Sequence, residues 1–307
     1  MKGKVGGFVQ KIGVALSGGG IRSFSQIPIM RAIEEDGIIL SAISGTSMGS
    51  VIAGLLACGL SADEVAERVL SIEDTLNERR TFKRFTKKLN PFNREKVLGG
   101  YVDGLELEEL LIEVLEPLGI KMISDVKIPL AIPAVDLITG KTIVFVSHPE
   151  RFKSLDEEWI VESDVTLSLA IRASCSFPFV IGSVEFGDYK LVDGGLTLNL
   201  PVPLLKGYNV DKTIGVTMHT DSDFSGDFSV IPLATRVMDI MRIQSDKSIL
   251  QETDVILNVP LDTIQIFDIG KGRATIEVGQ RIINENRSAL SKIIYKEPWY
   301  KSLFKKK

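Results

Sequence analysis

The 307-residue sequence is poor in histidine and cysteine, with two of each. Cys58 and Cys175 lie far apart in the chain and match neither a disulfide framework nor a metal-binding motif. We therefore expect buried thiols, no metal or cofactor, and a reducing, cytoplasmic location. A signal peptide is not indicated, because glycines interrupt the first residues. The longest apolar run, Val51 to Leu60, has about ten residues, well short of the roughly 20 that cross a bilayer.

A strong charge of one sign is also lacking, since the formal net charge is −4. A nucleic-acid partner would need a marked cationic surface, so we predict none. The share of hydrophobic residues is 44% and that of charged residues 25%, which is typical of a globular protein with a large core. Because no repeat or low-complexity linker occurs, we expect a single domain over residues 1–307; the oligomeric state is left open.

Short apolar segments alternate with helical patterns along most of the chain. This alternation predicts an α/β fold, a three-layer α/β/α sandwich with a mainly parallel central sheet. The predicted strands lie at residues 12–16, 38–43, 128–135, 142–146, 184–192 and 214–218. The predicted helices follow residue 26 up to Gly37 and lie at residues 51–60, 165–173, 234–250 and 274–294.

The stretch from Arg79 to Asn90 interrupts this alternation. On a helix its aromatic side chains would lie on one face and its basic side chains on the other, as in helices that lie on an anionic membrane. A solvated helix that packs its phenylalanines on the protein's own core would have the same pattern. From its position we expect a lid-like insertion at about 75–104, with substrate or membrane contacts from Phe82, Lys83, Arg84, Phe85 and Lys87.

A Gly-x-Ser-x-Gly pentapeptide joins an apolar strand to an apolar helix at Gly45-Thr46-Ser47-Met48-Gly49. In such an elbow the serine hydroxyl is exposed at the edge of the sheet, and the glycines let neighbouring backbone pass closely. The context indicates that Ser47 is a nucleophile.

Three glycines, Gly18, Gly19 and Gly20, follow the first predicted strand. Their backbone N–H groups could stabilise an oxyanion, as acyl transfer requires. A phosphate-binding turn is the alternative, but the lysine of a P-loop is missing and Ser23 replaces the last glycine of a dinucleotide fingerprint. Arg22 adds a positive charge that could anchor this loop or attract an anionic headgroup, or simply form an ion pair.

Two residues compete for the role of the base. His219 follows Asp193 in the chain, so Ser47, Asp193 and His219 would have the order of an α/β-hydrolase triad. Asp193 could instead act directly, since it ends an apolar segment and two glycines follow it, although Asp-Gly-Gly alone is more often a turn. The other histidine, His148, precedes a proline and is expected in a surface loop.

Together these motifs resemble the patatin-like phospholipase family. The resemblance rests on Leu16 to Arg22, Gly45 to Gly49 and Asp193 to Gly195, supported by the stretches 132–140, 173–178 and 199–203. It covers a catalytic core at about 11–206, followed by a strand and helices at about 210–295. It implies a Ser47/Asp193 dyad without histidine and an oxyanion hole formed by Gly18, Gly19 and Gly20 with Arg22. Ser23 and Phe177 depart from residues usual in the family.

The expected function is therefore hydrolysis of phospholipid or lysophospholipid esters through an acyl-enzyme. The partners would be a lipid ester substrate and, peripherally, an anionic membrane. Three alternatives remain: an esterase that uses His219, an acyltransferase on a thioester carrier, and a non-catalytic lipid-binding or protein-binding module. The acyltransferase is disfavoured because its motif generally has histidine where Thr46 stands.

Overall fold

A computed structural model describes residues 10–81, 102, 104–220 and 230–294. The strands in these residues join in a nine-stranded sheet. They are β1 (Ile12–Leu16), β2 (Leu40–Gly45), β3 (Leu130–Asp136), β4 (Thr142–Val146), β5 (Trp159–Glu162), β6 (Val184–Phe186), β7 (Tyr189–Asp193), β8 (Lys212–Thr217) and β9 (Val255–Asn258).

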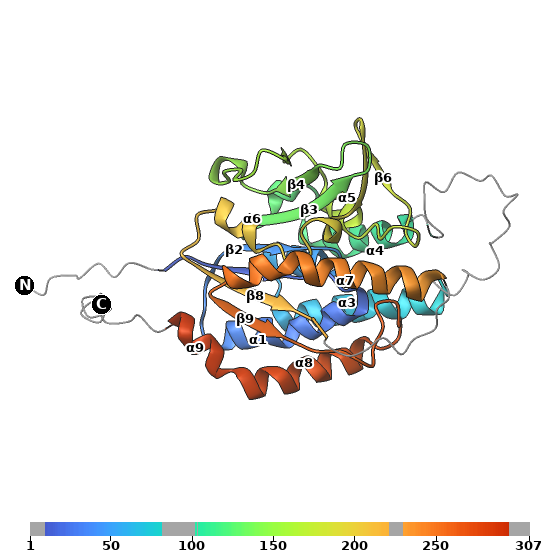
Figure 1. The fold of residues 1–307 in the computed structure, drawn as a ribbon. Coiled ribbons are helices and arrows are strands. Elements are labelled where there is room, and N and C mark those ends of the chain that lie inside the picture. Colours follow the sequence, from blue (N-terminus) through green and yellow to red (C-terminus); the bar gives the residue numbers. More distant parts are fainter. Residues whose placement is uncertain (1–9, 82–101, 103, 221–229, 295–307) are drawn as a thin grey trace, which may run out of the picture.

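The order of the strands in the sheet is β5-β4-β3-β2-β1-β8-β9, and β7 pairs with both β3 and β6. Among the described strands, five pairings are parallel and three, β3 with β4, β3 with β7 and β6 with β7, are antiparallel. Helices lie on both faces of the sheet (Figure 1). The predicted three-layer fold with a mainly parallel sheet is therefore confirmed.

The helices divide into two layers. One face of the sheet is covered by α1 (Ile27–Glu35), α2 (Met48–Ala57), α3 (Ala62–Glu78), α4 (Leu105–Leu115), α5 (Leu167–Ser174) and α8 (Gly272–Asn286), and the other by α6 (Val202–Gly207) and α7 (Val230–Gln251). Side chains of the central strands alternate between the two layers, with Val14 and Leu16 in the larger core and Ala15 in the smaller. A short helix, α9 (Ser288–Ile294), packs near β9.

The predicted secondary structure needs one correction and several additions. The expected single helix at 274–294 is two helices, α8 and α9, which meet at Arg287. The sequence analysis also missed α3, α4, α6, β5 and β9. Of these, α3 carries a clear local signal, because Ser61 and Glu64 form a reciprocal capping box at its N-terminus.

The expected lid-like insertion at about 75–104 lies mostly outside the described residues. Phe82, Lys83, Arg84, Phe85 and Lys87 all fall in that undescribed part. Residues 75–78 are the last residues of α3, and residues 105 onward belong to α4. In the described part of the chain, every helix is too short or too polar to cross a membrane.

Candidate active site

Ser47 stands between β2 and α2 in a strained conformation. Its backbone has φ 52° and ψ −132°, a positive φ that is costly for a residue with a side chain. The flanking glycines make the turn sterically feasible, since a Cβ on Gly45 would lie 2.4 Å from the Gly49 carbonyl oxygen and one on Gly49 would lie 2.5 Å from that of Leu16. The Gly-x-Ser-x-Gly segment therefore folds as a strand-turn-helix elbow.

The backbone around Ser47 is held by two other serines. Ser174, at the end of α5, accepts a hydrogen bond from the Ser47 N–H at 2.9 Å. Ser50 donates its hydroxyl to the Ser47 carbonyl oxygen at 2.6 Å. The Ser47 residue itself is 8% exposed and lines a cavity, so the elbow is fixed at the border of an open space.

Asp193 is the last residue of β7 and is fully enclosed, with 2% exposure. Its Oδ1 accepts the Gly195 N–H at 2.7 Å, whereas Oδ2 has no hydrogen bond within the described residues. Gly194 allows the tight turn, because a Cβ there would lie 2.2 Å from the Pro133 carbonyl oxygen. One oxygen of the carboxylate is thus anchored, and the other is left without a donor.

The charge state of Asp193 is set by competing effects. Burial raises the pKa of this carboxyl, while the neighbouring Ser47 hydroxyl, the Gly195 N–H and the positive charge of Arg242 act in the opposite direction. Burial is the largest effect, so the pKa lies above its ordinary value. A carboxylate with a raised pKa is a stronger base than an exposed one.

Cys175 lies beside the serine and the aspartate and lines the same cavity. Burial, reinforced by the charge of Asp193, raises the pKa of its thiol far above the ordinary range. The thiol is therefore protonated at neutral pH and is a poor nucleophile, which leaves Ser47 without a rival at this position.

The glycine loop approaches Ser47 from the end of β1. Gly18 donates its N–H to the Asn199 carbonyl oxygen at 3.2 Å, and a Cβ on Gly18 would lie 3.1 Å from the Cβ of Ser47. The N–H groups of Gly19 and Gly20 make no hydrogen bond within the described residues. The geometry thus divides the loop: Gly18 provides close approach, and the next two residues retain free donors.

Arg22 belongs to the short 3-10 helix Gly20–Gln26 that continues the loop. Its Nε donates to the Ile264 carbonyl oxygen at 2.5 Å, and its Nη1 lies 3.7 Å from Oδ2 of Asp239. The residue is 7% exposed. These contacts anchor the loop to the C-terminal half of the chain. Anchoring was one of the roles that the sequence analysis considered for Arg22.

Arg242, in the middle of α7, is a site residue that the sequence analysis missed. It forms an ion pair with Asp239 and lies over the ring of Phe177, with 5.9 Å from Cζ to the ring centroid. It also lies close enough to Asp193 to lower the pKa of that carboxyl. The spacing of Asp239, Arg242 and Asp246 along one side of a helix was the available signal.

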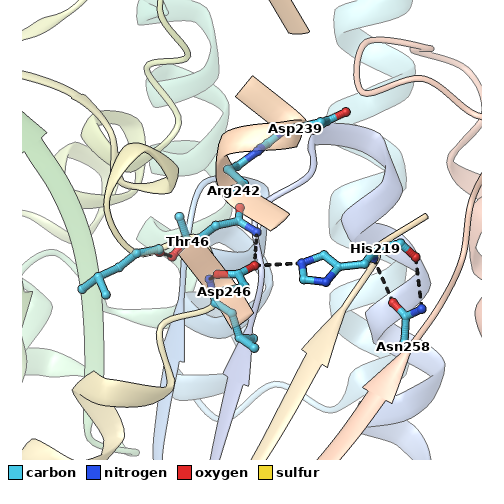
Figure 2. Close-up of polar contacts among 9 residues, drawn as sticks. Thr46, His219, Asp239, Arg242, Asp246 and Asn258 are labelled. Carbon is cyan, nitrogen blue, oxygen red and sulfur yellow. Dashed lines mark hydrogen bonds and ion pairs between the residues drawn. The ribbon is translucent and has the colours of Figure 1, made fainter. Parts of the chain in front are cut away.

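His219 follows β8, and its ring points toward Asp246 of α7, as Figure 2 shows. Its Nε2 lies 2.9 Å from Oδ2 of Asp246, a residue with 0% exposure, and its backbone N–H donates to Asn258. Asp246 also accepts from the Asn199 side chain and the Leu200 N–H. The structure thus brings Ser47 and Asp193 together but joins His219 to a different carboxylate.

Two cavities meet at this site. The larger, of about 930 Å³ including its opening, is mostly apolar and is lined by Ser47, Cys175, Phe177 and side chains of α3 and α4 such as Val69, Ile72, Leu76 and Leu107. The smaller, of about 360 Å³, is more polar and includes Gly18, Gly19, Arg22, Asn199, His219 and Asp239. Arg242 and Ile266 line both. Within the described residues, no cluster of three or more histidine, cysteine or acidic side chains could hold a metal.

Fold and site together define an α/β protein with a nucleophile elbow and an adjacent buried aspartate. Residues 14–206 match the model of the patatin-like phospholipase family, and the chain belongs to that family. The resemblance that the sequence motifs indicated is therefore confirmed.

An uncharacterized NTE family protein of Mycobacterium tuberculosis is 30% identical over 209 residues, which are 68% of this chain and 49% of that protein. An uncharacterized protein of Acanthamoeba polyphaga mimivirus is 32% identical over 218 residues, 68% of this chain and 67% of that protein. The structure of VipD from Legionella pneumophila aligns with a TM-score of 0.47 at 13% identity, covering 90% of this chain and 66% of that one. The chain spans about half the length of the mycobacterial relative.

Proposed function

We propose that this protein is a lipid acyl hydrolase in which Ser47 and Asp193 act as a catalytic dyad on carboxylic esters of phospholipids or lysophospholipids. The observation that carries the proposal is the buried Asp193 carboxylate beside the strained Ser47 elbow, with its Oδ2 unpartnered within the described residues. This oxygen is available to accept the serine proton, which a general base must do. Membership of the patatin-like phospholipase family supports a lipid ester as substrate.

The reaction would proceed in two halves. Ser47 Oγ attacks the ester carbonyl carbon as its proton passes to Asp193, and the tetrahedral intermediate collapses when Asp193 returns that proton to the leaving alcohol or lysolipid. In the second half Asp193 removes a proton from water, which attacks the acyl-serine, and Asp193 then returns that proton to Ser47 Oγ as the fatty acid leaves. Every proton that Asp193 takes up is thus passed on within the same half-reaction.

Stabilisation of the oxyanion would supply most of the rate. A carboxylate is a much weaker base than a serine alkoxide, so proton removal must accompany bond formation. The N–H groups of Gly19 and Gly20, which make no other hydrogen bond within the described residues, are the proposed donors to the oxyanion. The N–H of Met48, at the start of α2, can serve as a third. Gly18 and Arg22 hold the loop in place.

The apolar cavity supports a substrate whose ester carbonyl carries a long acyl chain. It extends from Ser47 and Cys175 between Val51 of α2 and the apolar side of α3. Apolar surface of this kind binds a hydrocarbon chain through the hydrophobic effect and excludes water from the ester. The smaller, polar cavity beyond Gly18 is suited to the leaving group.

The dyad and its rivals are separated by three substitutions. Turnover of p-nitrophenyl butyrate and of phospholipid vesicles should fall at least about a hundredfold in Ser47→Ala and in Asp193→Asn. His219→Ala should retain most of the activity, because His219 pairs with Asp246. A triad would instead require that His219→Ala abolish turnover.

A fluorophosphonate probe tests the non-catalytic alternative. Folded wild-type protein should be labelled at Ser47, and Ser47→Ala should not be labelled. Absence of labelling in wild-type protein with a normal thermal unfolding transition would overturn the proposal. Full activity of Asp193→Asn would overturn the dyad alone.

A further inference from the structure

The outward face of α7 carries an unusual amount of exposed apolar surface. Its side chains Leu233, Val237, Ile240 and Met241 are 42%, 48%, 53% and 59% exposed. At about 100° per residue these four positions fall within an arc of about 100°, so they form one continuous stripe along the helix. Isolated exposed apolar residues are common, but a contiguous stripe marks an interaction surface.

The acidic side chains of α7 point away from this stripe, and two basic side chains lie at its edge. Its carboxylates face the protein: Asp239 pairs with Arg22 and Arg242, and Asp246 is buried with His219. The basic side chains outside the site are Arg236, which is half-buried, and Lys247, which is exposed. Both lie along one edge of the stripe on the helical wheel. The outward face of α7 is therefore apolar from Leu233 to Met241, with Arg236 and Lys247 as a basic border at one edge, and it becomes polar at Gln244 and Ser248.

A strained phenylalanine adds to this surface. Phe179 is 62% exposed and has φ 69°, a conformation that costs energy for a bulky residue. Its neighbours Phe177, Val180 and Ile181 form a small cluster with Met238 of α7, so the turn that contains Phe179 packs against that helix. A turn that holds an aromatic ring out into solvent at a cost in strain is typical of a functional contact.

We propose that this docking surface, defined as Leu233, Val237, Ile240 and Met241 with Phe179 and the basic border, binds an anionic lipid bilayer. The inference rests on the proposed function, because a lipid hydrolase must take its substrate from a membrane. A convex helix with an apolar stripe and basic flank matches the apolar interior and negative surface of such a bilayer. Arg242, on the opposite side of the same helix, lines the apolar cavity, so α7 carries the exposed surface on one side and contacts the site with the other.

This assignment concerns other residues than those from which the sequence analysis expected membrane contact, and that expectation stays a prediction. Those residues lie in the stretch 79–90, of which the greater part is outside the described residues. The α7 surface was not apparent from the sequence, because charged residues such as Asp239, Arg242 and Asp246 alternate with its apolar residues. Only the structure shows that these charged side chains face the protein and leave the outer face without carboxylates.

Vesicle flotation tests the docking surface. The full chain carrying Ser47→Ala is mixed with phosphatidylcholine vesicles that contain about 30% phosphatidylglycerol, so that no lipid is consumed. Adding Ile240→Glu and Met241→Glu should weaken binding about tenfold or more, because two carboxylates replace apolar groups that enter the bilayer. The matched control is Ile138→Glu, at an apolar position of 63% exposure in the β3–β4 turn, which should not change binding.

A second variant guards against misfolding of the double substitution. Lys247→Glu reverses one border charge at an exposed position and should weaken binding to anionic vesicles about fivefold, with little change on pure phosphatidylcholine. Thermal unfolding confirms that each variant is folded. Because the parent already lacks Ser47, the result does not depend on whether Ser47 is the nucleophile.

Three results would overturn the inference: no binding of the parent to anionic vesicles, equal binding by the parent and the Ile240→Glu, Met241→Glu variant, or equal weakening by Ile138→Glu. Light scattering supplies a fourth. If the parent is a dimer and the double substitution makes it a monomer, the surface is covered by a second copy and not by lipid.

Discussion

Gly18 and Ser47 approach so closely that a Cβ atom on the glycine would lie 3.1 Å from the Cβ of the serine. The same atom would lie 3.0 Å from Oδ1 of Asn199, so a methyl group there must displace the loop or the elbow. The absence of a side chain at position 18 therefore lets the glycine loop come this close to Ser47.

We expect Gly18→Ala to lower kcat at least about tenfold, because a displacement of well under an ångström disturbs the alignment of the reacting groups. Gly119→Ala is the control: Gly119 has φ 70° and open space around its Cβ position, so its alanine variant costs about 1 kcal/mol of stability without touching the site. Esterase kinetics and thermal unfolding of the two variants separate the effects. Wild-type kcat in Gly18→Ala would contradict the assignment.

Arg242 should control the pH dependence of turnover. Its positive charge lowers the pKa of Asp193, which burial raises. Activity requires the ionised carboxylate, so kcat/KM falls as the pH is lowered through this pKa. Removing the charge in Arg242→Met should move that acidic limb to higher pH, whereas Arg242→Lys should leave it nearly in place. Profiles of kcat/KM against pH with a soluble ester measure the shift; an unmoved limb in the methionine variant would exclude the electrostatic link.

Asp193→Asn should be inactive yet more stable than wild type at neutral pH. A folded-state pKa above the unfolded value of about 4 means that the native protein binds the proton more tightly, so ionisation of Asp193 destabilises the fold. The stabilising contribution of the protonated group is complete below about pH 4 and is lost as the pH rises through the folded-state pKa. Urea unfolding at pH 4 and pH 8 should therefore show an advantage of asparagine only at the higher pH. A wild type that is more stable than Asp193→Asn at pH 8 would contradict this sign.

Asp246 should matter more for stability than its partner His219. The carboxylate accepts hydrogen bonds from the His219 ring, the Asn199 side chain and the Leu200 N–H, and it is fully buried. Asp246→Ala leaves several donors unpaired and should cost about 3 kcal/mol or more, whereas His219→Ala removes one partner and should cost about 1 kcal/mol. Urea unfolding at pH 7 gives both values, and the reverse order would show that the histidine dominates the network.

The elements around Ser47 and Gly18 were predictable because their chemistry is local. An apolar strand, a glycine-bounded turn and an apolar helix are contiguous in the sequence, and each is stabilised mainly by its neighbours in the chain. The boundaries moved by only a few residues: the strand predicted at 38–43 is Leu40–Gly45, and the helix predicted at 51–60 is Met48–Ala57. The aspartate could be located for the same reason, since Asp193 ends a strand and precedes the turn-forming Gly194.

The part that escaped prediction depends on contacts between distant segments. Arg242 and Asp246 stand in a helix without a motif, and only the packing of α7 on the segment after β7 brings them near Asp193 and Asn199. The sequence likewise could not show which of the three glycine N–H groups is engaged, because the partner of the Gly18 N–H is the distant Asn199 carbonyl oxygen. His219 was a reasonable candidate from chain order, but its orientation is determined by a carboxylate 27 residues further on.

Strand β1 pairs with β2 on one side and with β8 on the other, so that Ile12 lies beside Lys212. All three motifs of the site precede β8, yet the strand that carries the glycine loop keeps an open edge until β8 is in place. A growing chain that has emerged only as far as Asp193 therefore contains the glycine loop, Ser47 and Asp193 without the completed sheet that positions them. Pairing across such a sequence separation slows folding, so the site can be completed only after β8 has been synthesised.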